Sequence, residues 1–187
     1  MPNSTALLIV DVQMGMFESS LLPPVSQGDE LLTTLKKLMA RARAAGVPVI
    51  YVQHLGPKGD LLEEGTPAVA IHPDIRPREE DVVVRKHFCD SFHKTDLDQL
   101  LQSKSISNLV ITGIQSEFCV DTACRRAFGL GYQVTLVEDG HTTWDTQVLK
   151  APQIVAHHNL TLSGSFVKLA KSDSLFQDSP LKVAAGQ

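Results

Sequence analysis

The sequence has few cysteines, few aromatic residues and no cluster of positive charge. Three cysteines occur in 187 residues, and no two of them form a Cys-x-x-Cys pair. An odd count without paired spacing argues against a disulfide framework or a structural zinc site, and it favours a reducing compartment, the cytoplasm. No run of Lys or Arg occurs and the net charge is −4, which argues against nucleic acid as a partner.

Long apolar runs are missing as well. No stretch approaches the roughly 20 apolar residues that cross a bilayer, so we expect no membrane partner. The apolar segment near the N-terminus has no basic region before it and no cleavage site after it, which predicts a strand and not a signal peptide. A hydrophobic fraction of 43% and a charged fraction of 20% are typical of a globular protein. The length predicts one domain over residues 1–187, with the tail after about 170 unassigned.

Short apolar runs alternate with segments of helical periodicity. Strands are predicted at residues 6–10, 47–52, 81–85, 109–114 and 134–137, with a possible edge strand at 160–167. Helices are predicted around residues 31–42, from a Thr95 cap to 102, from 119 to 128 and at 147–159, where Pro152 marks the start or a kink. Continuous apolar strands are typical of parallel strands covered on both faces. The pattern therefore predicts an α/β fold with an open, doubly wound parallel sheet, Rossmann-like, and helices on both faces.

One connection is unusually long. Residues 55–80, between the second and third predicted strands, are rich in Gly, Pro and charge and show no clear periodicity. Loops of this length in a compact domain are usually functional, so we expect a lid or part of an interface.

Three reactive side chains follow predicted strands. Asp11 ends the first strand, Lys86 ends the third and Cys119 lies just after the fourth. Open parallel sheets bind ligands at the carboxyl ends of their strands, so these residues are expected at one edge. Each residue alone is commonly structural: a turn cap, a solvated lysine or a small buried thiol. Their coincidence at one edge is what favours a functional site.

The three cysteines differ in their expected surroundings. The apolar stripe of the helix that follows the fourth strand is predicted at Val120, Ala123, Cys124, Ala127 and Phe128. Cys124 is therefore assigned to the core. Cys119 is placed in the first turn, where the helix dipole favours a thiolate nucleophile. Cys89 has no such placement and is interpreted as structural or incidental.

Three stretches carry a resemblance to a known family: ALLIVDVQMGMF, VVVRKHFCDSFHKTDLDQLL and LVITGIQSEFCVDTACRRAFGLGYQV. Together they resemble the isochorismatase-like cysteine hydrolases over nearly the whole chain, with Ser116 in place of a usual Thr. The resemblance implies a catalytic triad of Asp11, Lys86 and Cys119. True isochorismatases lack the cysteine, so its presence implies the amidohydrolase branch, which cleaves a C–N bond of a small molecule through a thioester.

The resemblance has two further implications. The family turn after the fourth strand contains a cis peptide bond without proline, which falls between Ile114 and Gln115. This bond would direct the backbone N–H groups of Gln115 and Cys119 towards an oxyanion. The family also implies a homo-oligomer, a dimer or tetramer, and the 55–80 segment is a candidate for its interface.

The sequence departs from the nicotinamidases of this family. Those enzymes carry Asp-x-His metal ligands near the second strand, where this chain has Gln53 and His54. A metal site built from His54 and His72 is an alternative, but two neutral imidazoles make a poor ligand set. We therefore expect no metal and no cofactor, and we disfavour nicotinamide as the natural substrate.

The residues are compatible with several pocket contacts and with two competing functions. Substrate contacts or supporting residues are expected among Gln13, Phe17, His54, Asp90, Glu117 and Trp144. The stretch 139–145 is equally compatible with a pocket wall and with turn chemistry. The competing classes are a thiol-based redox sensor and a non-catalytic small-molecule binder. The Asp11–Lys86 pair argues against the sensor, because thiol oxidation does not need it.

Overall fold

Six strands form one parallel sheet in a computed structural model that describes residues 4–177. The strands are β1 Ser4–Val10, β2 Val49–His54, β3 Val82–Lys86, β4 Ile106–Ile114, β5 Gln133–Thr142 and β6 Lys168–Ala170. They lie in the order β3-β2-β1-β4-β5-β6, and every neighbouring pair is parallel. The predicted open, doubly wound α/β sheet is thereby confirmed.

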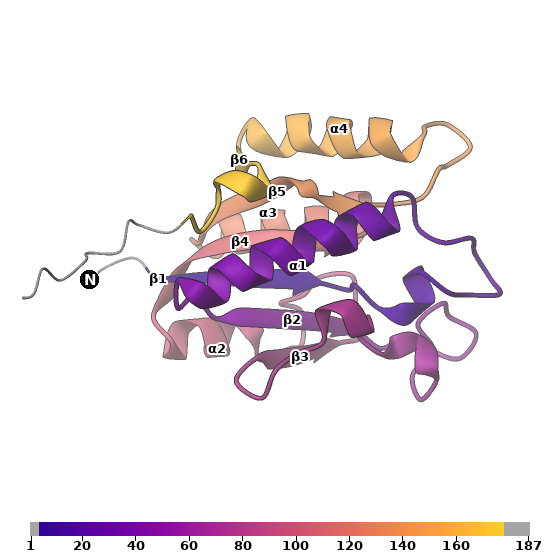
Figure 1. Cartoon of the computed structure of the whole chain (residues 1–187), viewed down its shortest axis with the longest axis horizontal. Helices are drawn as coiled ribbons and strands as arrows, with labels where there is room; N and C mark the ends of the chain where they lie inside the picture. Colours follow the sequence, from indigo (N-terminus) through magenta and orange to yellow (C-terminus); the bar gives the residue numbers. More distant parts are fainter. Residues whose placement is uncertain (1–3, 178–187) are drawn as a thin grey trace, which may run out of the picture.

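Helices cover both faces of this sheet (Figure 1). They are α1 Gly28–Ala44, α2 Leu97–Ser103, α3 Asp121–Gly129 and α4 Ala151–Ser163. Side chains of β1 alternate between the two faces, as expected for a strand. Leu7 and Ile9 pack with α1, whereas Ala6, Leu8 and Val10 pack with α2 and α3. Both faces of β1 are thus buried, which explains why its sequence is apolar throughout.

The structure corrects several predicted boundaries near the C-terminal half. The edge strand at 160–167 is wrong, because α4 continues to Ser163 and β6 covers only Lys168–Ala170. Leu162 belongs to the core of the sheet, and this packing favours the helix over the alternating pattern. Pro152 lies in the first turn of α4, where its missing N–H costs little, so the helix begins at Ala151 and not at 147.

Two details of the helices on the second face also differ from expectation. The second helix begins at Leu97 with Asp96 as its N-cap residue, while the Thr95 hydroxyl accepts from Leu97 N–H at 3.4 Å and donates to the Ser91 carbonyl. Phe128 is 48% exposed, although it was assigned to the apolar stripe of α3. Its ring packs edge-on against Phe166 near the end of the helix, where the sheet no longer covers it.

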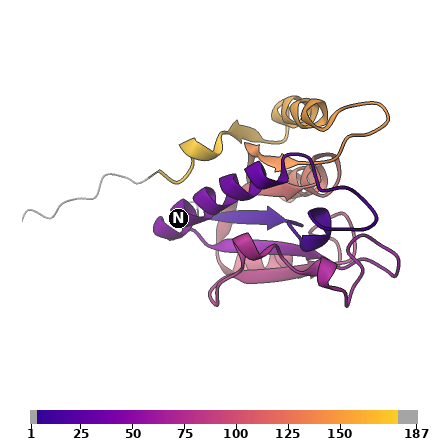
Figure 2. The ribbon, with the colours of Figure 1, turned by 45° about the vertical axis from the view of Figure 1, so that its right-hand side comes forward.

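The strand order reverses between β1 and β4, which places a crevice at the carboxyl ends of these two strands. In Figures 1 and 2 the arrowheads of β1 and β2 point to the same side of the molecule. Gly113 near the end of β4 has φ 135°, and a Cβ atom there would lie 2.0 Å from the Val10 carbonyl oxygen. Glycine therefore permits β4 to deliver the following turn beside Asp11.

The 55–80 segment folds back over this crevice. It contains the 3-10 turns η2 Pro67–Val69 and η3 Pro73–Ile75. Its backbone pairs with the segment after β1, since Met14 N–H donates to the Ala70 carbonyl and His72 N–H to that of Val12. The long connection thus becomes one wall of the region next to Asp11. No helix among residues 4–177 has the length and apolar character needed to span a membrane.

Candidate active site

Asp11 and Lys86 meet at the carboxyl edge of the sheet, although they are 75 positions apart in sequence. Asp11 directly follows β1 and adopts φ 51°, a left-handed conformation that aspartate tolerates better than most residues. Lys86 is the last residue of β3 and extends past β2 towards it. Lys86 Nζ lies 2.7 Å from Asp11 Oδ2, and both side chains are fully buried.

Cys119 lies in a π-helical turn, Ser116–Val120, which leads directly into α3. Lys86 Nζ donates to Cys119 Sγ at 3.1 Å and to the Cys89 carbonyl at 3.1 Å. With Asp11, these contacts provide an acceptor for each of the three hydrogens of the buried ammonium group. The structure therefore brings Asp11, Lys86 and Cys119 together, as predicted, and adds Cys89 to the group.

The ion pair determines the charge of Lys86. Burial alone would lower the pKa of Lys86, but the Asp11 carboxylate and the Cys119 sulfur outweigh it and keep that pKa above its usual value. The lysine is thus a permanent positive charge at neutral pH. A buried charge of this kind persists because it is paired with a carboxylate and donates two further hydrogen bonds.

Cys119 holds its proton in the resting site. Its pKa is raised by the neighbouring Cys89 thiol, by burial and by the Asp11 carboxylate, and the Lys86 charge opposes this only in part. The position in a first helical turn therefore does not produce a resting thiolate, contrary to the expectation from the helix dipole. Among residues 4–177, neither Asp11 oxygen accepts a hydrogen bond beyond the ion pair of Oδ2 with Lys86, so Oδ1 is available to receive the thiol proton.

The turn before Cys119 has the geometry that the family resemblance implied. The Ile114–Gln115 peptide bond is cis. The Gln115 carbonyl accepts from Phe118 N–H at 3.2 Å and Val120 N–H at 3.1 Å, which fixes the turn. Gln115 and Cys119 both line the cavity described next.

A cavity of about 330 Å³ is lined by two of the three clustered residues, Asp11 and Cys119, while Lys86 is buried and not part of the lining. Its walls are Asp11, Met16, Leu22, His54, Asp60, Leu61, Leu62, Cys89, Gln115, Phe118, Cys119 and Trp144. The reactive groups lie together while the remaining wall is mostly apolar, which is the usual composition of a small-molecule site. Most of the apolar wall has no signature in the sequence, because its residues come from four segments, which follow β1, β2, β4 and β5.

Two of the predicted substrate contacts line this cavity. His54 ends β2, and burial lowers its pKa, so its imidazole is neutral at pH 7. Trp144 follows β5, and its indole N–H donates to the Pro23 carbonyl at 2.7 Å, which fixes the ring at the wall. Of the 139–145 stretch, Trp144 is therefore pocket wall, while Asp139 and Asp145 accept hydrogen bonds from Ser172 and Ala151.

The other four predicted contacts do not line it, and each has another role. Gln13 uses its amide to bond the His54 backbone and the Val69 carbonyl, so it ties the 55–80 segment to β2. The Phe17 ring packs on His72 with centroids 4.6 Å apart. Asp90 accepts from Phe92 N–H at 2.8 Å. Glu117 accepts from Thr143 Oγ1 at 2.7 Å, which supports the turn around Cys119 from outside.

His54 and His72 do not share a site. His54 lines the cavity, whereas the His72 side chain accepts from Asp74 N–H and lies beside Phe17 in a separate hollow. Within the described part of the chain, no three His, Cys, Asp or Glu side chains converge as metal ligands would. These residues do not fit the metal site of the nicotinamidases.

This arrangement predicts that hydrolysis survives chelation. Prolonged dialysis against EDTA is expected to leave the rate of amide hydrolysis unchanged, because the triad needs no ligand beyond its own side chains. The measurement is turnover before and after dialysis, with and without added Zn²⁺. Loss of activity that zinc restores would show that His54 or His72 takes part in a metal site.

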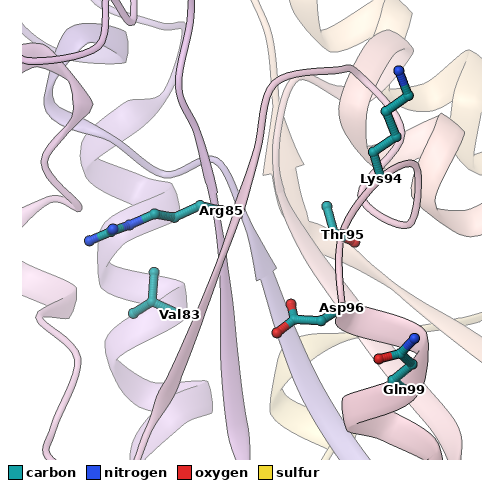
Figure 3. A pocket seen from close by; sticks show the side chains of 6 residues that line it. All are labelled: Val83, Arg85, Lys94, Thr95, Asp96 and Gln99. Atoms are coloured by element: carbon teal, nitrogen blue, oxygen red, sulfur yellow. The ribbon is translucent and has the colours of Figure 1, made fainter.

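A second hollow lies between β3 and the start of α2 (Figure 3). Its lining residues are Val83, Arg85, Lys94, Thr95, Asp96 and Gln99. Arg85 extends away from Asp96 and Gln99, so the charged groups do not converge on one point (Figure 3). This hollow contains none of the clustered reactive residues, and the Cys119 cavity is therefore the candidate active site.

Comparison with known proteins agrees with this geometry. The isochorismatase domain family matches residues 5–157. A streptothricin hydrolase from Streptomyces noursei is 36% identical over 80% of this chain, which spans only 52% of that enzyme's length. The ureidoacrylate amidohydrolase RutB from Agrobacterium fabrum is 30% identical over 74% of this chain and 75% of its own length.

A solved structure has the same fold. The crystal structure of an isochorismatase hydrolase from Oleispira antarctica superposes with a TM-score of 0.88 at 31% identity. The superposition covers 94% of this chain and 97% of the other. The match of sequence and fold over most of its length means that this chain belongs to the isochorismatase-like hydrolase family.

Proposed function

We propose that this protein hydrolyses an amide-type C–N bond of a small molecule, with Cys119 as the nucleophile and a thioester as the intermediate. Hydrolysis of a C–N bond follows from the family and from relatives named streptothricin hydrolase and ureidoacrylate amidohydrolase. The observation that carries the cysteine mechanism is the contact of one buried ammonium, Lys86 Nζ, with both Asp11 and Cys119, which line one cavity.

The first half of the reaction forms the thioester. Asp11 takes the proton of the Cys119 thiol as the sulfur attacks the carbonyl carbon of the substrate. Lys86 stabilises the negative charge that appears on the sulfur, and this charge exists only during reaction because the resting thiol is protonated. The N–H groups of Gln115 and Cys119 stabilise the oxyanion. Protonated Asp11 then gives its proton to the leaving nitrogen, and the C–N bond breaks.

The second half regenerates the enzyme. Water enters where the amine has left, and Asp11 removes a proton from it as it attacks the thioester carbonyl. The Cys119 sulfur leaves and takes a proton back from Asp11. Lys86 stays charged throughout, since its pKa is held above the usual value. One carboxylate thus serves in turn as base, acid, base and acid, which its buried Oδ1, free of hydrogen bonds within residues 4–177, permits.

The cavity limits the substrate class. A volume of about 330 Å³ suits a small molecule, and the apolar wall formed by Met16, Leu62, Phe118 and Trp144 favours an amide with an apolar part. The neutral His54 imidazole offers one hydrogen-bonding group on that wall. Nicotinamide stays disfavoured, because the metal ligands of nicotinamidases are missing from this chain.

The direct test uses a panel of small amides, ureas and carbamoyl compounds, with release of ammonia or amine as the readout. Hydrolysis of at least one compound is expected, together with a Cys119 acyl adduct in the mass spectrum of rapidly quenched enzyme. Turnover without any covalent adduct, even with added hydroxylamine as a trap, would contradict the thioester route. Saturable binding of these compounds without turnover would favour the non-catalytic binder.

We also propose that the protein acts in the cytoplasm as a homo-oligomer, a dimer or tetramer. Its three free cysteines fit a reducing compartment. Large apolar side chains are exposed at Leu21, Leu22, Phe118, Val148 and Leu149, of which Leu22 and Phe118 line the cavity. Exposed apolar surface of this extent is typical of an interface.

Light scattering on purified protein tests the oligomer. The expected mass is two or four times the 20.4 kDa of one chain. A Val148→Asp variant, at a site 86% exposed, should shift the mass towards the monomer if this surface is the interface. A wild-type mass equal to one chain at all concentrations would refute the oligomer.

A further inference from the structure

A second thiol lies in the candidate active site, and the proposed mechanism has no use for it. Cys89 was interpreted from sequence as structural or incidental. In the structure it lines the same cavity as Cys119, and its backbone carbonyl accepts from the Lys86 ammonium that also donates to Cys119 Sγ. Two cysteines that are 30 positions apart in sequence thus share one buried cation.

The Cys89 side chain points to the helix that carries Cys119. Its Sγ lies 3.4 Å from the Thr122 hydroxyl, and Thr122 is one helical turn beyond Cys119. Cys89 and Cys119 both line the cavity, and the Lys86 ammonium donates to the Cys89 carbonyl and to the Cys119 sulfur. The geometry therefore places two thiols on the wall of one cavity.

The two thiols differ in accessibility and acidity. Cys89 is exposed, Cys119 is partly buried and Cys124 is fully buried. Interaction with the Cys119 thiol lowers the pKa of Cys89 to about 6, while Cys119 keeps its proton. Because the proton stays on Cys119, Cys89 is the sulfur that ionises first. Oxidants react with exposed thiolates, so Cys89 is the sulfur they meet first.

We propose that Cys89 and Cys119 form an intramolecular disulfide when the protein meets a hydroperoxide, and that this bond reversibly switches off the site. Cys89 has the role of a resolving neighbour that protects the nucleophile. The sequence argument against a redox sensor rested on the Asp11–Lys86 pair, which thiol oxidation does not need, and it left Cys89 as structural or incidental. Formation of the disulfide does not depend on the proposed function. Only its consequence, loss of hydrolysis, rests on that function.

The chemistry balances in two steps. The Cys89 thiolate attacks one oxygen of the hydroperoxide, an S–O bond forms, the O–O bond breaks, and water or an alcohol leaves after taking up a proton. The Cys119 sulfur then attacks the Cys89 sulfur, the S–S bond forms, and the S–O bond breaks. Water leaves with the Cys119 proton. Overall, the two thiols lose two hydrogens and the hydroperoxide is reduced.

The test is peptide mapping of the folded, full-length protein after treatment with H₂O₂, with free thiols alkylated under denaturing conditions. We expect a peptide linked through Cys89 and Cys119, a fall from three free thiols to one, and a return to three after dithiothreitol. Hydrolytic activity should fall and recover in parallel. The buried Cys124 gives the matched control, since Cys124→Ala should still form the linked peptide.

Cys89→Ser separates the switch from other damage. The substituted side chain is exposed, so the variant should fold, and its Cys119 should oxidise to sulfinic acid that dithiothreitol does not reverse. Wild-type protein that shows only sulfinic or sulfonic Cys119, or a disulfide between two molecules, would overturn the proposal. Peptide mapping does not depend on turnover. An inactive fresh enzyme that still forms the linked peptide would therefore refute the proposed hydrolysis and not the switch.

Discussion

Replacement of Cys119 by alanine is expected to lower amide hydrolysis by at least about 10⁴-fold, because its sulfur is the one that contacts Lys86 Nζ, whereas the Cys89 sulfur contacts the Thr122 hydroxyl. Lys86 and Asp11 remain in place in this variant and keep their ion pair. Its fold and its affinity for substrate should therefore be close to those of the wild type. The measurements are turnover on an accepted amide and equilibrium binding of the same amide.

Cys124→Ala is the matched comparison. Cys124 is fully buried in the apolar stripe of α3, and burial raises the pKa of its thiol, so it is an inert thiol within the core. Its truncation should leave turnover near the wild-type value and cost about 1–2 kcal/mol of unfolding free energy through the cavity it creates. An equal loss of turnover in the two variants would show that Cys119 has no catalytic role distinct from that of the core cysteine.

Lys86→Met is expected to lower turnover by about 10²–10⁴-fold and to move the alkylation of Cys119 to higher pH. The Lys86 charge lowers the pKa of Cys119, so its removal raises that pKa further. Asp11 is then left buried without its cation. Loss of one partner from a buried ion pair should also cost about 3–5 kcal/mol of unfolding free energy.

The alkylation experiment needs to resolve two thiols. Iodoacetamide reacts with Cys89 as well, so the rate against pH is measured from the peptide that contains Cys119, or in a Cys89→Ser background. Circular dichroism shows whether the variant is folded before the rates are compared. Lys150→Met removes an exposed ion pair whose Nζ–Oδ2 distance to Asp145, 2.8 Å, is similar to that of the Lys86–Asp11 pair. This variant should change neither turnover nor alkylation. An unchanged Cys119 profile in Lys86→Met would remove Lys86 from the surroundings of the sulfur.

The backbone framework was predictable because local patterns encode it. The apolar runs that end at Asp11 and Lys86 marked parallel strands, and the carboxyl-edge rule placed both residues at one crevice. Boundaries were less accurate where two patterns compete. The 160–167 stretch alternates like a strand, yet Leu162 packs on the sheet as the last turn of α4.

Local sequence patterns did not predict which residues line the cavity or how the pKa of Cys119 is shifted. A helix N-terminus predicted a thiolate for Cys119, but burial and the Cys89 thiol determine the opposite resting state. These influences come from residues distant in sequence, and no periodicity reports them. The wall residues Leu62 and Trp144 likewise meet only because the 55–80 segment folds back over the end of β1.

The sequence by itself determined the sheet, the family and the meeting of Asp11, Lys86 and Cys119 at one edge, since strand ends follow from hydrophobic patterning. Only the tertiary structure decided which sulfur holds the proton, which side chains shape the cavity, and that Cys89 is a neighbour of Cys119. The physical reason is that burial and contacts between side chains depend on how segments distant in sequence are arranged in three dimensions. They depend on loops of irregular conformation whose course no local pattern encodes.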